Sequence, residues 1–197
     1  LVHGPSPEFN EPGCWPDYLG TAYVDESVAL IKDFDVFTRS EQAFSLMGNH
    51  EHAHVGGPVV AKFYADEAAV LEAALGDDHP RVCDFMREFP LLAVGSCGIV
   101  LTHGAPYTTE AHLADFENLR YAGYEEVAIE EMIHENHLAA LLWARHASPA
   151  QARHLLEVAF ADENPQGFVA FGHDVVFEGY ETIGNEQICV STSFGLE

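Results

Sequence analysis

With 197 residues, 48% of them hydrophobic, the chain can bury the core of a domain, which argues against a disordered protein. It carries 8 Lys and Arg residues against 32 Asp and Glu residues, a net charge of −24. A surface this negative repels phosphate backbones, so we expect no nucleic acid as a partner; it suits a high-salt cytoplasm or a basic partner.

The N-terminal third is predicted to hold a loop, a helix and a strand. Residues 4–20 are rich in proline and glycine, which is typical of a loop. Apolar residues at helical spacing predict a helix over residues 24–34. The short apolar run 43–47 predicts a buried strand whose C-terminal end leads into Asn49 and His50.

The middle of the chain is predicted to hold two helices and a hairpin. Acidic residues open a predicted helix over residues 66–75, and Gly76 follows its end. A second helix is predicted over residues 80–89, with proline at its first position. The apolar runs 91–94 and 98–102 flank a short turn and predict a hairpin.

Helices dominate the C-terminal half. Helical periodicity predicts helices over residues 109–119 and 125–143, and Ser148 with the proline after it is typical of the start of another. The runs 168–171 and 188–191 are rich in β-branched or aromatic residues and predict strands. This mixture of helices and strands, without a repeat or a linker, favours one α/β domain.

Cysteine spacing and hydropathy indicate the compartment. The 4 cysteines are scattered, with no C-x-x-C pair, which argues against a zinc ribbon and a disulfide scaffold. No apolar run approaches the length of a transmembrane helix, and no signal peptide is visible. We therefore expect a cytoplasmic protein without a membrane partner.

Three predicted strands each end in a polar side chain that can bind a metal: Asn49, His103 and His173. Loops at the ends of strands are where α/β folds place their sites. An amide oxygen and two imidazoles form a plausible ligand set for Mn²⁺, Fe or Zn²⁺. Together the three positions predict a metal site.

Asn49, His103 and His173 also belong to a longer series of sequence motifs. The series consists of Gly48-Asn49-His50-Glu51, Phe89-Pro90-Leu91-Leu92-Ala93, Leu101-Thr102-His103-Gly104, Leu141-Leu142-Trp143, Gly172-His173-Asp174-Val175-Val176 and Glu178-Gly179-Tyr180-Glu181. In this order the motifs resemble the phosphoprotein phosphatase family of calcineurin-like metallophosphoesterases. The first run matches that family's G-N-H-E, which is moderately specific alone and strong within the series.

The resemblance implies a mixed α/β (α+β) fold, a four-layer β-sandwich flanked by helices, with metal ligands on loops at one edge. The family's bridging carboxylate and the ligands of its first metal come from two upstream motifs, and residues 1–5 resemble only the tail of the second. We therefore expect residues 1–197 to be a single metallophosphoesterase domain, truncated at its N-terminus and missing its first strand–helix unit.

The resemblance also implies a reaction, the hydrolysis of phosphomonoesters in a phosphorylated protein or a small phosphoester, with phosphoserine or phosphothreonine protein favoured. Two divalent metal ions about 3.5–4 Å apart, Mn²⁺ first with Fe or Zn²⁺ as alternatives, would supply a bridging hydroxide for in-line attack. Asn49, His103 and His173 would ligate the second ion. His50 matches the general acid, a role that suits an imidazole because its pKa lies near neutrality.

Several positions depart from the family pattern. Met47 stands where an arginine usually precedes G-N-H-E, and the D-R-G arginine has no counterpart near His3. Arg145 is the remaining candidate to bind phosphate, with a solvated helix-end arginine as the alternative. The aspartate that orients the general acid in the family is also replaced, because Val2 and His3 occupy the matching stretch.

Two more side chains complete the predicted site. Tyr180 is expected to bind substrate. Asp174, next to His173, is expected to hydrogen-bond a metal-bound imidazole or to be an ordinary exposed loop residue.

The departures motivate two alternative functions. The altered phosphate-binding residues favour a hydrolase of nucleotide or dinucleotide polyphosphates on the same fold. The absent first-metal ligands favour a non-catalytic binding protein. The sequence argues against a serine hydrolase or a P-loop nucleotide-binding protein, because neither G-x-S-x-G nor G-x-x-x-x-G-K-[ST] occurs.

Overall fold

The computed structural model describes residues 26–62, 65–163 and 165–191. They form two compact units. The first unit contains the described residues as far as Ser45, then His50–Phe89 and Ala122–Glu125. The second contains Leu46–Asn49, Pro90–Tyr121 and the described residues from Glu126 onward. The predicted loop at residues 4–20 lies outside the described residues.

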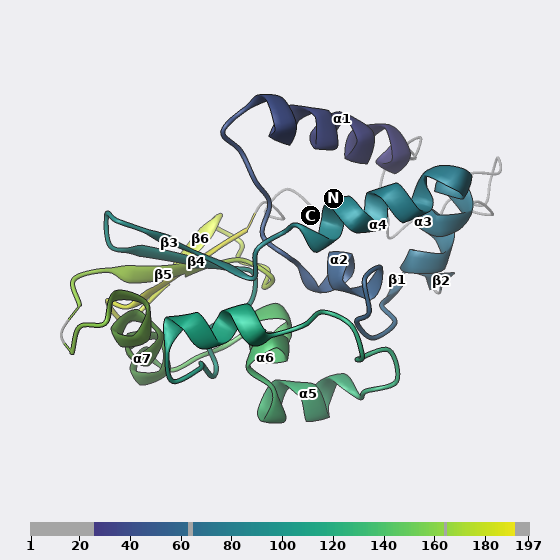
Figure 1. The fold of residues 1–197 in the computed structure, drawn as a ribbon. Coiled ribbons are helices and arrows are strands. Elements are labelled where there is room, and N and C mark those ends of the chain that lie inside the picture. The colour runs from purple at the N-terminus through teal and green to yellow at the C-terminus, as the bar shows by residue number, and fades with distance from the viewer. Residues whose placement is uncertain (1–25, 63–64, 164, 192–197) are drawn as a thin grey trace. The chain divides into compact units, whose positions relative to one another are not determined.

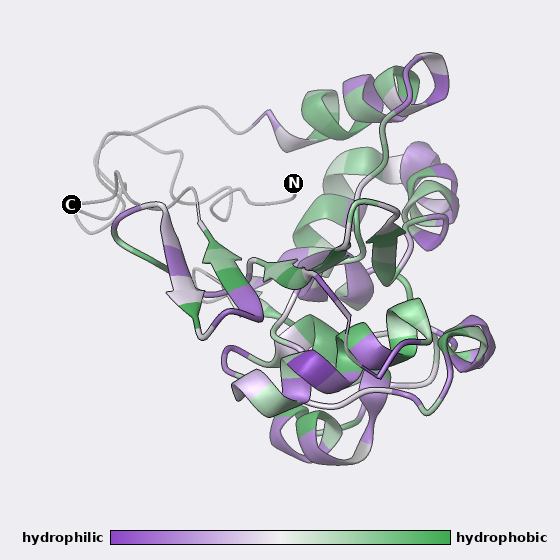
Figure 2. Ribbon diagram, turned by 90° about the vertical axis from the view of Figure 1, so that its left-hand side faces the viewer, coloured by the Kyte–Doolittle hydropathy of each residue, from purple (hydrophilic) through white to green (hydrophobic). Residues whose placement is uncertain are grey.

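The first unit is mainly helical. Its elements, with the first residue of α2 belonging to the second unit, are α1 (Ser27–Ser40), α2 (Asn49–Ala53), β1 (Ala61–Lys62), β2 (Ala65–Asp66), α3 (Glu67–Leu75), the 3-10 helix η3 (Gly76–Asp78) and α4 (His79–Arg87). β1 and β2 form a two-stranded antiparallel ribbon. Hydrophobic and hydrophilic stretches alternate along α1 (Figure 2), whose buried residues are Ser27, Ile31 and Asp35.

Aromatic packing and ion pairs join the helices of this unit. Phe34 on α1 packs edge-on against Phe85 and Phe89, with ring centroids 6.0 and 6.3 Å away. Beside them, the buried carboxylate of Asp35 pairs with Arg81 on α4 and with Arg39 one turn along its own helix. A buried carboxylate is stable only when it is paired, so these contacts fix α1 against α4.

The predicted boundaries of α3 are confirmed. The Asp66 side chain caps the helix by accepting hydrogen bonds from the backbone N–H groups of Ala68 and Ala69, at 3.0 and 3.4 Å. Gly76 ends it with φ +54°, a conformation that glycine adopts without strain. The predicted helices at 24–34 and 80–89 are also present, as α1 and α4.

The predicted strand at residues 43–47 is wrong. The segment is irregular, and the Phe44 side chain is 60% exposed rather than buried. Met47 donates its N–H to the carbonyl of Pro90, at 2.9 Å. Proline has no N–H with which to return the bond, so no ladder grows from this contact.

The second unit is built around a five-stranded sheet in the order β3-β4-β5-β7-β6 (Figure 1). Its strands are β3 (Leu92–Gly95), β4 (Ile99–Thr102), β5 (Phe168–Phe171), β6 (Tyr180–Ile183) and β7 (Gln187–Val190). The three central strands β4, β5 and β7 are parallel, and β3 and β6 run antiparallel at the two edges. The predicted hairpin and both predicted C-terminal strands are therefore confirmed, whereas β6 is a strand that the sequence analysis missed.

Two predicted helices of this unit differ from the structure. The helical pattern over residues 109–119 gives only a short 3-10 helix, η4 (Leu113–Asn118). The expected single helix over residues 125–143 is two, α5 (Ile129–Glu135) and α6 (His137–Trp143). Asn136 separates them with extended backbone (φ −138°, ψ 123°), and its side chain caps α6 at the N–H groups of Leu138 and Ala139. Asparagine competes for backbone hydrogen bonds in this way, which explains the break.

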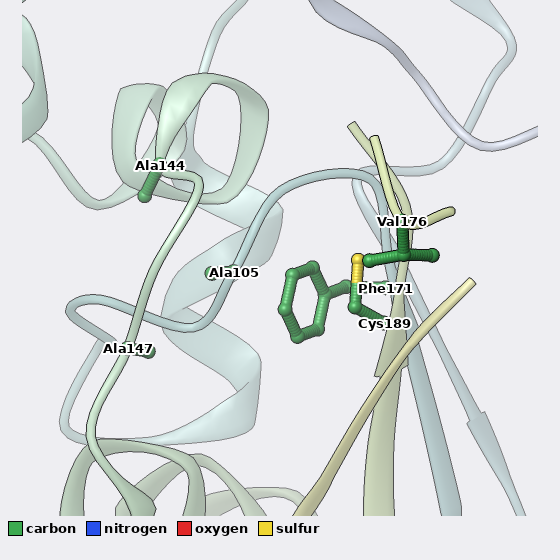
Figure 3. Packing of buried hydrophobic residues seen from close by; sticks show 6 residues of the cluster. All are labelled: Ala105, Ala144, Ala147, Phe171, Val176 and Cys189. Atoms are coloured by element: carbon green, nitrogen blue, oxygen red, sulfur yellow. The ribbon is translucent and has the colours of Figure 1, made fainter. Parts of the chain in front are cut away.

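A helix and a small apolar cluster cover the sheet. α7 (Pro149–Phe160) begins at the predicted Ser148 cap and packs against β5 (Figure 1). The Phe171 ring is 1% exposed and lies between Ala105 on one side and Val176 and Cys189 on the other (Figure 3). This cluster fixes the C-terminal end of β5, where His173 follows.

The predicted mixture of helices and strands is confirmed, and the large sheet of the described residues is the five-stranded one. The prediction of a single domain, truncated at its N-terminus, stays a prediction. Within the described ranges, no helix combines the length and the hydropathy that crossing a membrane requires.

Candidate functional site

Adjacent parallel strands bring two of the predicted metal ligands together. Thr102 at the end of β4 is in register with Phe171 at the end of β5, so the residues that follow leave the sheet at the same edge. The Gly172 N–H donates to the carbonyl of His103, at 2.9 Å, and holds the two loops side by side. His103 Nε2 consequently lies 3.2 Å from His173 Nδ1.

Asn49 reaches the same place from another segment. It opens α2, and its side chain is buried. Its Oδ1 lies 2.8 Å from His103 Nε2. The hydrogen bond from Met47 to Pro90 fixes the preceding chain close to the start of β3, the antiparallel partner of β4. All three predicted metal ligands are thus gathered into one cluster.

Backbone hydrogen bonds clamp the His103 loop to the end of α6. The N–H groups of Gly104 and Ala105 donate to the carbonyls of Leu141 and Ala144, at 2.6 and 2.7 Å. These are carbonyls of the last helical turn and the residue after it, which have no partners within the helix. A Cβ at position 104 would lie 3.0 Å from the Leu141 and Ala144 oxygens, so only glycine fits without a shift.

The His173 backbone is held in an unusual conformation. Its φ is +65°, in the left-handed region, where histidine is found more often than most non-glycine residues. The Trp143 ring meets the His173 ring edge-on, with centroids 6.1 Å apart and planes at 80°. The Asp174 N–H donates to the Gly172 carbonyl at 2.7 Å and closes the tight turn around the histidine. Packing and turn geometry together aim this imidazole at His103.

Arg145 and Asp174 form an ion pair next to the cluster. Arg145 Nη1 donates to Asp174 Oδ1 at 3.0 Å and to the His173 carbonyl at 3.2 Å. The arginine side chain is 53% exposed. These contacts engage Nη1 alone, so the guanidinium sits beside the cluster with further N–H donors available to an anion. The predicted bond from Asp174 to a metal-bound imidazole stays a prediction.

The cluster fits one divalent cation by the chemistry and spacing of its donors. Ligand atoms about 2.0–2.2 Å from a shared ion lie about 2.8–3.6 Å from one another, between octahedral and tetrahedral angles, and the observed 2.8 and 3.2 Å fall in this range. All three donors are neutral, which suits Mn²⁺, Fe or Zn²⁺ completed by further ligands. Within the described ranges, no group of three or more His, Cys, Asp and Glu side chains able to hold a metal occurs.

His50 follows Asn49 directly, but its ring is held in the first unit. His50 Nδ1 lies 2.5 Å from Oε2 of Glu67, the first residue of α3. The Glu67 side chain is buried, 6% exposed, whereas His50 is 26% exposed. The sequence analysis missed Glu67, whose only signal was its place in the acidic first turn of a predicted helix.

Tyr180 lies at the start of the edge strand β6, opposite Val190 of β7. Tyr180 is 60% exposed. β7 separates its strand from β5, which leads to His173. The substrate-binding role of Tyr180 stays a prediction.

Comparison with known proteins identifies the family. The family model described as calcineurin-like phosphoesterase matches residues 15–177, most of the chain and all three clustered donors. The chain belongs to the calcineurin-like phosphoesterase family. Members of this family are hydrolases that generally use divalent metals.

A solved structure supports the same fold. This phosphoesterase superposes with a TM-score of 0.53 on a protein serine/threonine phosphatase from Saccharomyces cerevisiae that is described as similar to human phosphatase PP5. The two are 15% identical over 83% of this chain and 51% of the yeast chain, so the phosphoesterase spans about half the length of that structure. No curated protein matches the sequence.

Proposed function

We propose that this calcineurin-like phosphoesterase hydrolyses phosphomonoesters with the help of two divalent metal ions, first of all Mn²⁺, and that phosphoserine or phosphothreonine in proteins is its substrate. The observation that carries the proposal is the meeting of Asn49 Oδ1, His103 Nε2 and His173 Nδ1 at one sheet edge. The family match adds the reaction class. His50, the next residue after Asn49, adds a group that can carry a proton.

The metal-binding part of the proposal assigns one ion to the three clustered side chains. Bound divalent cations would supply activated water and neutralise charge on the phosphoryl group. The Gly172 N–H donates a hydrogen bond to the His103 carbonyl, which holds together the two loops that would supply the imidazole ligands. Little ordering entropy then remains to be lost on binding.

His50 acts on the leaving group. An alkoxide from serine or threonine is a poor leaving group, and a proton delivered to its oxygen as the P–O bond breaks lowers the barrier. In line with this role, the His50 imidazole is partly exposed and its Nδ1 is engaged by Glu67, so we assign the transferred proton to Nε2.

Arg145 binds the phosphoryl oxygens. A guanidinium next to the cluster matches the geometry of a phosphate group and donates charge-assisted hydrogen bonds. Asp174 limits the movement of this side chain through its contact with Nη1. Tyr180 is assigned to the substrate side on the sequence resemblance alone.

The test starts from protein stripped of metal with a chelator. We expect hydrolysis of p-nitrophenyl phosphate to return when Mn²⁺ is added, and a phosphoserine peptide to be cleaved faster than a diadenosine polyphosphate. A preference for the dinucleotide would replace the proposed substrate by the alternative one. Metal bound at near two ions per chain without any turnover would instead overturn the proposed activity in favour of a binding protein.

A further inference from the structure

We propose that Glu67 is a positioning residue for His50: its carboxylate fixes the tautomer and the orientation of the imidazole, so that Nε2 carries the proton given to the leaving group. This inference rests on the proposed function, in which His50 is the general acid. It adds Glu67, which lies 17 positions after His50 and on a different helix, to the residues proposed for general-acid catalysis.

The contact between the two side chains is short and sheltered. His50 Nδ1 and Glu67 Oε2 are 2.5 Å apart, and the carboxylate side chain is 6% exposed. A carboxylate buried to this degree is stable only with a partner that donates a hydrogen bond or carries positive charge. The imidazole is such a partner, so the pair differs from an ordinary surface contact.

The start of α3 holds Glu67 in place. Glu67 is the first residue of the helix, directly after the Asp66 cap. Its own N–H donates to the Val60 carbonyl at 3.2 Å, which ties the helix start to the preceding segment. The partial positive charge of a helix N-terminus favours the ionised carboxylate at this position. Backbone, cap and helix dipole therefore present a fixed anion to His50.

The chemistry of the two groups determines where the protons are. An ionised carboxylate only accepts hydrogen bonds, so Nδ1 must carry a hydrogen. In the protonated imidazole, Nε2 carries the second one. When the P–O bond breaks, this proton moves from Nε2 to the leaving alkoxide oxygen, and the neutral ring keeps its Nδ1–H on Glu67. Because the Nδ1–H stays on Glu67 throughout, the ring does not rotate during the transfer.

Another histidine–glutamate pair on the same helix provides a matched control. Glu72 on α3 lies 3.8 Å from His79, measured from Oε1 to Nδ1, and its side chain is 64% exposed. Exchanging this carboxylate for an amide makes the same chemical change in the same helix, but at a solvated and longer contact. Glu72→Gln therefore controls for loss of charge on α3.

The experiment compares Glu67→Gln, Glu72→Gln, His50→Asn and the unaltered protein, all loaded with Mn²⁺, on two substrates. A phosphoserine peptide needs its leaving group protonated, whereas nitrophenolate leaves without help. We expect Glu67→Gln to lower kcat on the peptide about 10- to 100-fold and on p-nitrophenyl phosphate about 3-fold or less. Glu72→Gln should match the unaltered protein on both. Equal losses on the two substrates for Glu67→Gln, or none, would overturn the proposal.

The same series separates this proposal from the proposed function. If His50→Asn lowers turnover selectively on the peptide and Glu67→Gln does not, the acid role of His50 holds and the role of Glu67 is wrong. If His50→Asn has no selective effect, the proposed acid itself is wrong, and Glu67 has no acid to position.

A spectroscopic measurement tests Glu67 without turnover. Nitrogen-15 NMR of the histidine rings should show His50 as the Nδ1–H tautomer in the unaltered protein and a shift towards Nε2–H in Glu67→Gln, because glutamine can also donate a hydrogen bond. An unchanged tautomer would overturn the proposal. If Glu67→Gln fails to fold, Glu67→Asp keeps the charge on a shorter side chain and should give a smaller change in the same direction.

Discussion

Asn49 and His50 are neighbours in the chain, yet their side chains enter two very different environments. Asn49 joins a cluster of neutral donors at the edge of a sheet, where each partner follows a different strand or loop. His50 meets a single buried anion at the start of a helix. A neutral cluster leaves the charge to an incoming cation, whereas a carboxylate fixes where a proton resides. Under the proposed function, two consecutive residues at the start of α2 therefore have different roles, Asn49 in binding metal and His50 in transferring a proton.

The two environments are also stabilised differently. Backbone hydrogen bonds position the cluster, through Gly104, Ala105 and Gly172. The His50–Glu67 pair depends on side chains and on one helix start. Substitutions in the cluster should therefore change metal affinity, whereas substitutions in the pair should change proton transfer and leave the metal bound.

The largest expected effect comes from removing the central donor of the cluster. His103 contacts both other donors, so His103→Ala should lower Mn²⁺ affinity and metal-dependent turnover by at least about 100-fold, since even outer contacts of metal ligands are worth about 10- to 100-fold. Titration calorimetry with Mn²⁺ measures the affinity. His154→Ala, an exposed histidine on α7, is the control. Unchanged Mn²⁺ affinity in His103→Ala would show that the cluster of Asn49, His103 and His173 does not bind the metal.

A smaller effect is expected from removing Arg145, the positively charged side chain beside the neutral cluster. Arg145→Ala should weaken inhibition by inorganic phosphate about 10-fold or more, because charge-assisted hydrogen bonds are lost. The thermal midpoint should barely change, since an exposed ion pair contributes little to stability. Arg153→Ala, which breaks an exposed pair with Glu186, should leave phosphate inhibition unaltered. If both variants behave alike, Arg145 does not bind phosphate.

The role of the backbone in positioning the cluster is tested at two glycines. In Gly104→Ala the new methyl would lie 3.0 Å from two carbonyl oxygens, so the free energy of unfolding should fall by about 1–3 kcal/mol. Gly172→Ala is the matched change, because its methyl would meet its nearest oxygen at 3.6 Å, an ordinary contact. Urea denaturation of both variants gives the difference. Equal stabilities would show that the Leu141 and Ala144 carbonyls can move to accommodate the new methyl group.

The smallest effect is expected from pH in the first unit. Burial lowers the pKa of His54, with Glu51 opposing, and the ring's buried Nδ1 has no hydrogen-bond partner in the described part of the chain. The unfolded chain takes up a proton near pH 6.5 while the folded one does not, so stability is full above that pH and falls below it.

The measurement is the free energy of unfolding between pH 7.5 and 5.5. His54→Gln should flatten the fall across this window, and His146→Gln, at an exposed position, should not. Parallel curves for His54→Gln and the unaltered protein would show that another group causes the pH dependence.

Local chemistry explains what the sequence could predict. The ends of α3 follow from Asp66 and Gly76, and the start of α7 follows from Ser148 and its capping partner Gln151. Such signals act within one helical turn, so they are readable without the fold. The cluster was predictable for a related reason: each donor directly follows a motif or an apolar run.

The remaining features depend on partners that are distant in sequence. Residues 43–47 are apolar like a strand, but their partner segment contains Pro90. β6 lies at an edge with mostly exposed side chains, so it carries no alternating pattern to read. The pairing of His50 with Glu67 depends on the position of α3, which no local rule supplies. In each case tertiary context decided the outcome.

The positive φ of His173 has a consequence for how substitutions at this position should be judged. A non-glycine residue in that conformation costs about 1–3 kcal/mol, which glycine would avoid. His173→Gly would therefore relax the backbone while deleting one of the three proposed metal donors. At this position a screen for thermal stability and a screen for activity would select opposite residues, so a stabilised variant carrying glycine at 173 would mark the loss of the site rather than an improvement of the protein.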